Sequence, residues 1–423
     1  MKKIISCLLA FAMLTCLYSP AFALESKLSS SNRIEESIME NAACEQYSNL
    51  LTSFFELYGD SYPAFYAGAY INDSHDLVIK TTLDITDMDM TLIKECAKSQ
   101  DVIIDASAEY SLNDLLILQE RIEDYYCANY NFSSIAPEIN SISVSSEENA
   151  IMVGVQNLTP ALKEALLSEI AQGISSRQYS VLPISLVEEQ VPSSPTSYAP
   201  IAEPTDSLED AMVTALIEVN PSEIVIADFG NGYAGSGLIG FPASRRTSSG
   251  TEYGFVTAAH LLMDAPGWTE GNKNYSCYNS YNQHIGTMVY TKFSGKVDAG
   301  FVRCSSTTSC GHSIYTGVTL YEIQGYGSAP EGTTVAAMNR NGDIVYGEIS
   351  STNGTISIGG KTINDVYTVS GMSLNEGDSG GPLFRHFGYE SVTVLGILSA
   401  GSSRLQKFCK VSNIISGLNV SFT

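Results

Sequence analysis

A glycine-rich turn near the carboxyl end of the chain holds the serine whose surroundings best suit covalent chemistry. Ser379 lies in the run Asn375-Glu-Gly-Asp-Ser-Gly-Gly-Pro-Leu383, which leads into an apolar segment. Glycines adopt backbone angles that other residues resist, so successive N–H groups can point into one small concavity. A serine in such a turn can attack a carbonyl carbon while the N–H groups of Gly377 and Ser379 bind the developing oxyanion. The alternative for this run is a plain hairpin or a phosphate-binding turn.

A serine hydroxyl is a weak nucleophile without a base, and the chain offers a histidine in a suitable position. His260 follows the β-type run Gly254-Phe-Val-Thr-Ala-Ala259, which predicts an imidazole at the end of a strand. Such a base needs a carboxylate that holds its tautomer and stabilises the imidazolium. Asp298, in Val297-Asp-Ala-Gly-Phe-Val302, is flanked by small and apolar residues and is predicted to fill that role. Asp264 and Asp343 are the alternatives.

Around these residues the chain divides into regions of different texture. The first 23 residues predict an export signal, with Lys2 and Lys3 before an apolar run and Ala21-Phe22-Ala23 as the cleavage site. An uncleaved anchor is the alternative. Residues 24–190 predict an α+β region, 191–221 a Pro/Ser-rich linker and processing region, and 222–423 a β-rich domain.

The predicted α+β region repeats one order of elements: strand, strand, helix and strand occur twice, at a spacing of roughly 70 residues. The strands are expected at 70–71, 77–79, 102–104, 142–144, 150–155 and 179–184, and the helices at 87–98, 112–126 and 160–173. A further helix is expected at 206–219. Two similar subdomains are therefore predicted.

The region after Pro221 changes to short β-branched and aromatic runs separated by Gly, Asn and Ser, which is typical of a sandwich or barrel. Strands are expected at 236–241, 254–258, 287–290, 317–321, 334–338, 366–370 and 393–399.

Charge and hydropathy limit the possible partners. The 423 residues carry a formal net charge of −24, so nucleic acid and anionic membrane surfaces are not expected to bind. Only 16% of the residues are charged and 44% are hydrophobic, which indicates a globular protein. No run after the signal reaches the length of a membrane span, so the mature protein is expected to be secreted, monomeric and free of the membrane.

The cysteines of the carboxyl-terminal half allow disulfide bonds after export. Cys277, Cys304, Cys310 and Cys409 are an even number and permit three connectivities. Cys304 and Cys310 are close enough in sequence to close a short loop, which leaves Cys277 to pair with Cys409. No CxxC or HExxH run occurs, so neither a metal site nor a cofactor is expected.

Three runs taken together carry a resemblance to a known family. Thr257-Ala-Ala-His260, Asp298-Ala-Gly-Phe-Val302 and Gly377-Asp-Ser-Gly-Gly-Pro382, in this order, resemble the chymotrypsin-fold serine peptidases. The short spacings resemble the bacterial secreted branch that includes α-lytic protease and the streptogrisins. This resemblance covers about residues 222–423 and implies two six-stranded antiparallel β-barrels. It also implies that His260, Asp298 and Ser379 form a catalytic triad between the barrels.

The resemblance implies further roles for individual residues. Residues 398–401 correspond to the segment that pairs with the substrate backbone. The pocket for the P1 residue, which precedes the cleaved bond, is implied to be lined by Ser373, Leu374, Ser399, Ala400 and Gly401. No carboxylate stands at Ser373 and no histidine at Leu398, so an apolar or aromatic P1 residue of medium size is expected.

A structural ion pair is also implied by the resemblance. Arg340 matches an arginine of the bacterial branch that pairs with the acid before the catalytic serine, here Asp378. Two of the family's usual disulfides are missing, because no cysteine follows His260 directly and none brackets Ser379.

Two interpretations of the amino-terminal half remain open. As a pro-region it would assist folding of the barrels, which have many non-local contacts, and occupy the active site until it is cleaved. As an adhesion module it would accompany a non-catalytic binding protein of the same fold. An esterase is a third possibility, since residues 377–381 match Gly-x-Ser-x-Gly, but only His386 follows the serine closely. The favoured prediction is a secreted serine endopeptidase that acts on proteins or peptides.

Overall fold

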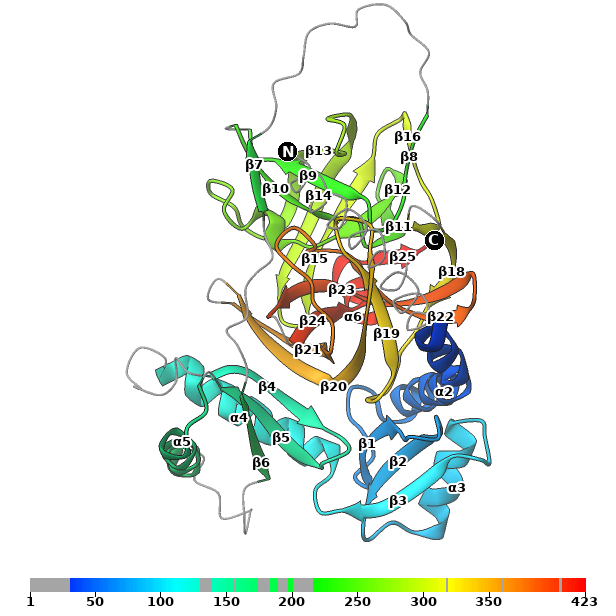
Figure 1. The fold of residues 1–423 in the computed structure, drawn as a ribbon, viewed down its shortest axis with the longest axis vertical. Coiled ribbons are helices and arrows are strands. Elements are labelled where there is room, and N and C mark those ends of the chain that lie inside the picture. The colour runs from blue at the N-terminus through cyan, green and yellow to red at the C-terminus, as the bar shows by residue number, and fades with distance from the viewer. Residues whose placement is uncertain are drawn as a thin grey trace, which may run out of the picture.

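The computed structural model describes residues 31–129, 139–155, 157–173, 183–188, 197–200, 216–230, 232–316, 319–358, 361–402 and 405–423. Within these ranges the amino-terminal half combines helices with strands, whereas the carboxyl-terminal half consists almost wholly of strands (Figure 1). The predicted fold class is confirmed at this level. The export signal predicted for residues 1–23 and most of the predicted linker lie outside the described residues.

The amino-terminal half contains two units with the same strand pairing. The first consists of β1 (Tyr66–Ile71), β2 (Leu77–Thr82), α3 (Asp87–Cys96) and β3 (Ile103–Ala108). The second consists of β4 (Ile139–Ser145), β5 (Ala150–Val155), α5 (Pro160–Gly173) and β6 (Ile184–Glu188). In each unit the first two strands are antiparallel and the last two are parallel. The predicted repeat is therefore confirmed.

Two longer helices complete this half. α4 (Leu112–Asn129) was expected from the sequence, but α2 (Asn41–Tyr58) was not. The buried residues of α2 are Ala43, Cys44, Tyr47, Leu50 and Phe54. They recur every three or four positions, which is the pattern of an amphipathic helix, so the signal for α2 was present in the sequence.

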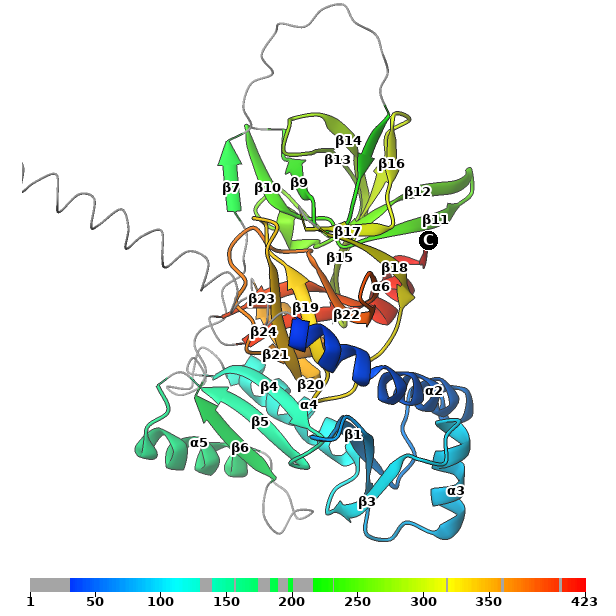
Figure 2. The same ribbon diagram turned by 45° about the vertical axis from the view of Figure 1, so that its right-hand side comes forward.

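The first carboxyl-terminal sheet has the order β25-β11-β12-β15-β14-β13-β9-β10-β7. Its strands are β7 (Ser197–Pro200), β9 (Ile224–Asp228), β10 (Tyr233–Leu238), β11 (Phe241–Thr247), β12 (Gly250–Thr257), β13 (Gly271–Tyr278), β14 (His284–Ser294), β15 (Val297–Cys304) and β25 (Val420–Phe422). The sheet forms the upper part of the molecule in Figure 1 and Figure 2.

The second carboxyl-terminal sheet lies between the first sheet and the amino-terminal half (Figure 2). Its strands are β17 (Ser313–Tyr315), β18 (Leu320–Tyr326), β19 (Thr334–Met338), β20 (Ile344–Ile358), β21 (Lys361–Ser370), β22 (Pro382–Gly388), β23 (Ser391–Gly401) and β24 (Leu405–Lys410). A short helix, α6 (Val411–Leu418), follows β24 and buries Val411, Ile414 and Leu418.

Two elements expected from the sequence are placed differently. Of the strand expected at 179–184, residues 179–182 lie outside the described residues, and β6 (Ile184–Glu188) begins at its last position. The helix expected at 206–219 is wrong at its carboxyl end, because β8 (Ile217–Val219) pairs in parallel with β16 (Thr308–Cys310). The β-branched residues of β8 gain a sheet neighbour that is distant in the sequence, and this pairing overrides the local helical pattern.

The amino-terminal half is joined to the second carboxyl-terminal sheet through its strands. β4 pairs antiparallel with β20, which places Val144 opposite Asn353 and Ser143 opposite Gly354. The hydroxyl of Ser351 also donates to the carbonyl of Val144 over 2.6 Å. The sheet of the second amino-terminal unit therefore continues into the carboxyl-terminal half.

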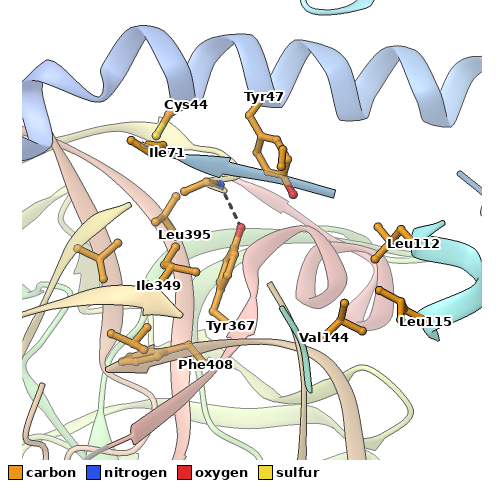
Figure 3. Close-up of a cluster of buried hydrophobic side chains, with 14 of the residues drawn as sticks. Cys44, Tyr47, Ile71, Leu112, Leu115, Val144, Ile349, Tyr367, Leu395 and Phe408 are labelled. Atoms are coloured by element: carbon orange, nitrogen blue, oxygen red, sulfur yellow. Dashed lines mark hydrogen bonds between the residues drawn. The ribbon is translucent and has the colours of Figure 1, made fainter. Parts of the chain in front are cut away.

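One hydrophobic cluster extends through both halves (Figure 3). It combines residues of the amino-terminal half with residues of β20, β21 and β24, among them Tyr47, Leu112, Leu115, Val144, Ile349, Tyr367 and Phe408. At its centre the hydroxyl of Tyr367 accepts a hydrogen bond of 3.2 Å from the backbone N–H of Ala329. Burial of this shared apolar surface favours the joined state of the two halves.

Candidate active site

Three residues from separate parts of the carboxyl-terminal half form one hydrogen-bonded chain. His260 Nδ1 lies 2.5 Å from Asp298 Oδ2, and His260 Nε2 lies 2.7 Å from Ser379 Oγ. All three side chains are fully buried. This is the geometry in which an imidazole can take a proton from a serine hydroxyl while a carboxylate holds the other ring nitrogen.

Strand pairing in the first sheet brings the histidine and the aspartate together. β12 pairs with β15, with Thr257 opposite Gly300, so the residues after β12 lie beside the start of β15. The backbone N–H groups of Ala259 and His260 each donate to Asp298 Oδ1 over 3.0 Å. Asp264 and Asp343, in contrast, are both exposed, and Asp343 accepts from Nδ2 of Asn339, so neither is shown in contact with His260.

The serine reaches the pair from a turn between β21 and β22. The carbonyl of Ser379 accepts from the N–H of Leu238 over 2.7 Å, which fixes the turn against the first sheet. Gly380 has a positive φ of 83°, and a Cβ there would lie only 2.4 Å from Thr257 Oγ1. Gly377 also has a positive φ, 91°. The turn therefore depends on glycine for its angles and for its close packing.

A fourth residue contacts the aspartate, and the sequence did not predict this contact. Ser399 Oγ donates to Asp298 Oδ2 over 2.7 Å, so Asp298 accepts hydrogen bonds from two backbone amides, His260 and Ser399. These partners offset the cost of burying a carboxylate. Ser399 was expected in the wall of the substrate pocket, and this role stays a prediction; its hydroxyl faces Asp298. The contact between Ser399 and Asp298 depends on how distant strands pair, and a single sequence does not give that pairing.

Asp378, the predicted ion-pair partner of Arg340, accepts hydrogen bonds from the backbone. The backbone N–H of Arg340 donates to Asp378 Oδ1, and that of Asn375 donates to Oδ2, each over 2.7 Å. Burial raises the pKa of Asp378, while these two hydrogen bonds and the charge of Arg340 lower it. Two backbone amides thus hold the carboxylate that precedes Ser379, and its ion pair with the guanidinium of Arg340 stays a prediction.

The segments predicted to form the substrate pocket lie close to the serine. Gly380 N–H donates to the carbonyl of Leu398 over 2.8 Å, and Leu398 N–H donates to the carbonyl of Gly381 over 2.9 Å. β23 is therefore fixed to the Ser379 turn directly before residues 399–401. Ser373 is exposed, whereas Leu374 is buried.

A cavity of about 560 Å³ separates one wall of the predicted pocket from the amino-terminal half. Ser141 and Ser143 of β4 line one side, and Met372 and Ser373 line the other. The amino-terminal half thus lies against the segment that precedes Ser379.

The predicted disulfide pairs have different outcomes. The sulfur atoms of Cys304 and Cys310 lie 2.9 Å apart, and a bond between them stays a prediction. The pairing of Cys277 with Cys409 is wrong, because both are buried free thiols in different hydrophobic clusters. Cys409 lies 3.3 Å from Ser399 Oγ, and burial with the nearby charge of Asp298 raises its pKa to about 12. Elimination among four cysteines failed because a thiol is also stable as a small apolar core residue.

Of the helices that the structure describes, none is long and apolar enough to cross a membrane. Within the same described ranges, no cluster of three or more His, Cys, Asp or Glu residues could hold a metal ion.

Comparison with known proteins gives a family-model match and a relative of known sequence. Residues 33–108 match the family model of a Pro-like N-terminal domain. "Serine protease 2" of Streptomyces fradiae is 30% identical over 170 residues, which are 40% of this chain and 90% of that protein.

Solved structures also resemble the chain. Protease A of Thermobifida fusca is 21% identical with a TM-score of 0.39, covering 49% of this chain and 98% of that one. A Nocardiopsis protease is 23% identical with a TM-score of 0.38, covering 48% of this chain and 99% of that one.

Proposed function

The chain belongs to the chymotrypsin-fold family of bacterial serine proteases, and from this premise we propose that it is a secreted endopeptidase made as a self-inhibited precursor. The hydrogen-bonded chain Ser379–His260–Asp298 is the observation that carries the proposal. Its three members have the atoms, spacing and order that acyl transfer needs.

In this proposal each member of the chain has a defined step. Ser379 Oγ attacks the carbonyl carbon of the scissile peptide bond while His260 Nε2 takes its proton. Asp298 keeps the imidazole in the required tautomer and stabilises the imidazolium. The N–H groups of Gly377 and Ser379 bind the oxyanion. His260 then protonates the leaving amine, and water releases the acyl group from Ser379 by the same steps in reverse.

The amino-terminal half is proposed to be the pro-region. Its match to a Pro-like N-terminal domain, the pairing of β4 with β20 and the shared hydrophobic cluster support this assignment. The full burial of Ser379 fits a precursor whose active site is closed. Export after removal of residues 1–23 and cleavage between about 190 and 225 belong to the same proposal.

The two alternative functions lack comparable support. A non-catalytic binding protein would not need Ser379, His260 and Asp298 in hydrogen-bond contact. An esterase with the order Ser before His would need His386, which lies on β22 with its Nε2 3.4 Å from the hydroxyl of Tyr346. Burial also lowers the pKa of His386 to about 4.

The pocket for the P1 residue is proposed to accept an uncharged side chain. Ser373, Leu374, Ala400 and Gly401 carry no charge that could pair with a charged P1 residue. Medium apolar or aromatic residues are the range expected from the sequence.

Mass spectrometry of a denatured peptide mixture tests this function directly. The secreted protein should cleave the mixture, and Ser379→Ala should abolish both this cleavage and the processing of the precursor. Ser249→Ala, in an exposed turn, is the matched control and should cleave like the wild type. A processed wild-type protein that cleaves nothing would refute the enzyme and favour the binding protein.

A further inference from the structure

A buried glutamine lies between the two segments that form the walls of the proposed P1 pocket. Gln406 stands in β24 directly opposite Gly401 of β23, and its side chain is fully buried. A Cβ on Gly401 would lie only 1.7 Å from Gln406 Oε1, so the amide packs against the glycine backbone. Glycine at 401 therefore makes room for this side chain.

The amide of Gln406 connects both walls by hydrogen bonds. Its Nε2 donates to the carbonyl of Ser402 over 2.6 Å and approaches the carbonyl of Met372 at 3.5 Å. One carbonyl follows Gly401, and the other precedes Ser373. Because both acceptors face the same end of the amide, they fix which end is nitrogen and which is oxygen.

The oxygen of this amide has no hydrogen-bond partner among the described residues. Gln406 Oε1 is buried and unsatisfied, although buried polar atoms are normally paired. An unpaired buried acceptor is unfavourable, because it has lost its hydrogen bonds to water. Leu374 follows one wall in the sequence, Leu398 precedes the other, and both are apolar side chains that offer no donor. A hydroxyl that entered between the walls would supply the missing hydrogen bond.

We propose that Gln406 forms the floor of the P1 pocket and restricts P1 to small side chains, among which Ser and Thr are favoured because they donate to Oε1. This inference rests on the proposed endopeptidase function. Within the uncharged P1 residues proposed above, it selects small side chains in place of the medium apolar or aromatic ones expected from the sequence. A ring or a long apolar chain could enter only if the amide moved, and the hydrogen bonds to both walls would then be lost. Large apolar and aromatic P1 residues are therefore excluded.

Kinetics with matched peptides test the pocket. The substrates differ only at P1, which is Ala, Val, Thr or Phe, and kcat/KM is measured for the mature enzyme. The wild type should prefer Ala to Phe by at least about tenfold and Thr to its isostere Val by about tenfold. Gln406→Gly should raise the Phe-to-Ala ratio by about 10- to 100-fold, since it removes the floor. Gln406→Met should keep the exclusion of Phe and abolish the preference for Thr over Val.

The controls separate this inference from the function on which it rests. Gln283→Gly, an exposed glutamine in a turn of the first sheet, should leave every ratio unchanged. Labelling by a small organophosphorus reagent that modifies an activated serine counts competent enzyme for each variant, whatever its P1 preference. A labelled wild type that cleaves Phe as well as Ala overturns the role of Gln406 even if no variant folds, and leaves the endopeptidase intact. A processed wild type that is neither labelled nor active refutes the function itself.

Discussion

The candidate active site and the junction between the two halves both contain buried carboxylates, but different hydrogen-bond donors surround these carboxylates. Asp298 is fully buried and accepts from two backbone amides, from His260 and from Ser399. Glu331 is almost as buried, yet it accepts hydrogen bonds from the hydroxyl of Ser145 and the N–H of Ser146, over 2.8 and 2.7 Å. Both of these donors are neutral.

The junction contains two further buried carboxyls, of which Glu40 also lies 3.5 Å from Nδ1 of His75. Glu40 accepts from the N–H and the hydroxyl of Thr334, over 2.7 and 3.0 Å, and Glu123 accepts from the hydroxyl of Thr355. Each of these contacts joins the amino-terminal half to the carboxyl-terminal half. Burial raises the pKa of Glu40, of Glu123 and, to about 7, of Glu331.

The difference shows which hydrogen bonds are expected to persist during catalysis and which are expected to break when the two halves separate. The carboxylate of Asp298 has four donors, one of which is the imidazole of His260, and it stays in place during the reaction that we propose. Carboxyls whose pKa is raised by burial are favoured in the protonated form, so the contacts they make weaken as the pH rises. The junction is thus held by groups whose charging opposes it, as expected for a pro-region that must leave.

The largest expected effect is at the aspartate of the triad. Asp298→Asn would donate rather than accept at one position and would favour the wrong tautomer of His260, so kcat should fall by about 10⁴. Active-site-titrated kinetics on a peptide substrate measure this loss. Binding of the amino-terminal half should not change, because Asp298 makes none of the junction contacts. A variant with normal kcat would remove Asp298 from the mechanism.

We expect the affinity between the two halves to depend on pH and not on the residues of the catalytic triad. Burial raises the pKa of Glu331 from 4.5 to about 7, so the joined state binds a proton that the separated state releases. The stabilising contribution is fully present below pH 4.5 and is lost as the pH rises through about 7. His386 has the opposite effect on the stability of the folded protein. Burial lowers its pKa from 6.5 to about 4, so its contribution is present above pH 6.5 and is lost as the pH falls through about 4. Comparison with Glu331→Gln isolates the effect of Glu331.

The measurement uses Ser379→Ala precursor whose linker has been cut by an added protease. Sedimentation at pH 5 and pH 8 gives the affinity between the halves. Relative to Glu331→Gln, the affinity of the parent chain should fall by about 10² between these pH values. Glu322→Gln, an exposed glutamate of β18, is the control and should behave as the parent. If the affinity of the parent chain and that of Glu331→Gln change equally between pH 5 and pH 8, Glu331 does not make the junction sensitive to pH.

The same comparison shows where sequence reasoning succeeded. His260, Asp298 and Ser379 stand in short runs whose residue types announce their chemistry, and the paired α+β units repeat a pattern of local periodicity. Both signals lie within a few consecutive residues. The structure brings the three side chains into contact, and the repeat has the expected order of strands and helix.

The features that the sequence did not yield depend on pairing between distant segments. The contact of Ser399 with Asp298 and the placement of Gln406 against Gly401 follow from strand register. β8 became a strand because β16 lies beside it. Cys277 and Cys409 were paired by elimination, but they lie in different cores. None of these outcomes is encoded by the neighbouring residues alone.

The smallest expected effect tests whether Asp298 needs all of its donors. Ser399→Ala removes one hydrogen bond to Oδ2 and leaves the bonds from His260 and from the two backbone amides. A hydrogen bond to a charged group contributes about 1.5–3 kcal/mol, so kcat should fall by at least about tenfold. Ser350→Ala removes a hydroxyl that donates to the carbonyl of Thr368 and makes no contact with Asp298 or His260 among the hydrogen bonds described, and it is the matched control. If KM rises while kcat stays constant, Ser399 acts on the substrate instead, and the fixed carboxylate that distinguishes the active site from the junction requires only three donors.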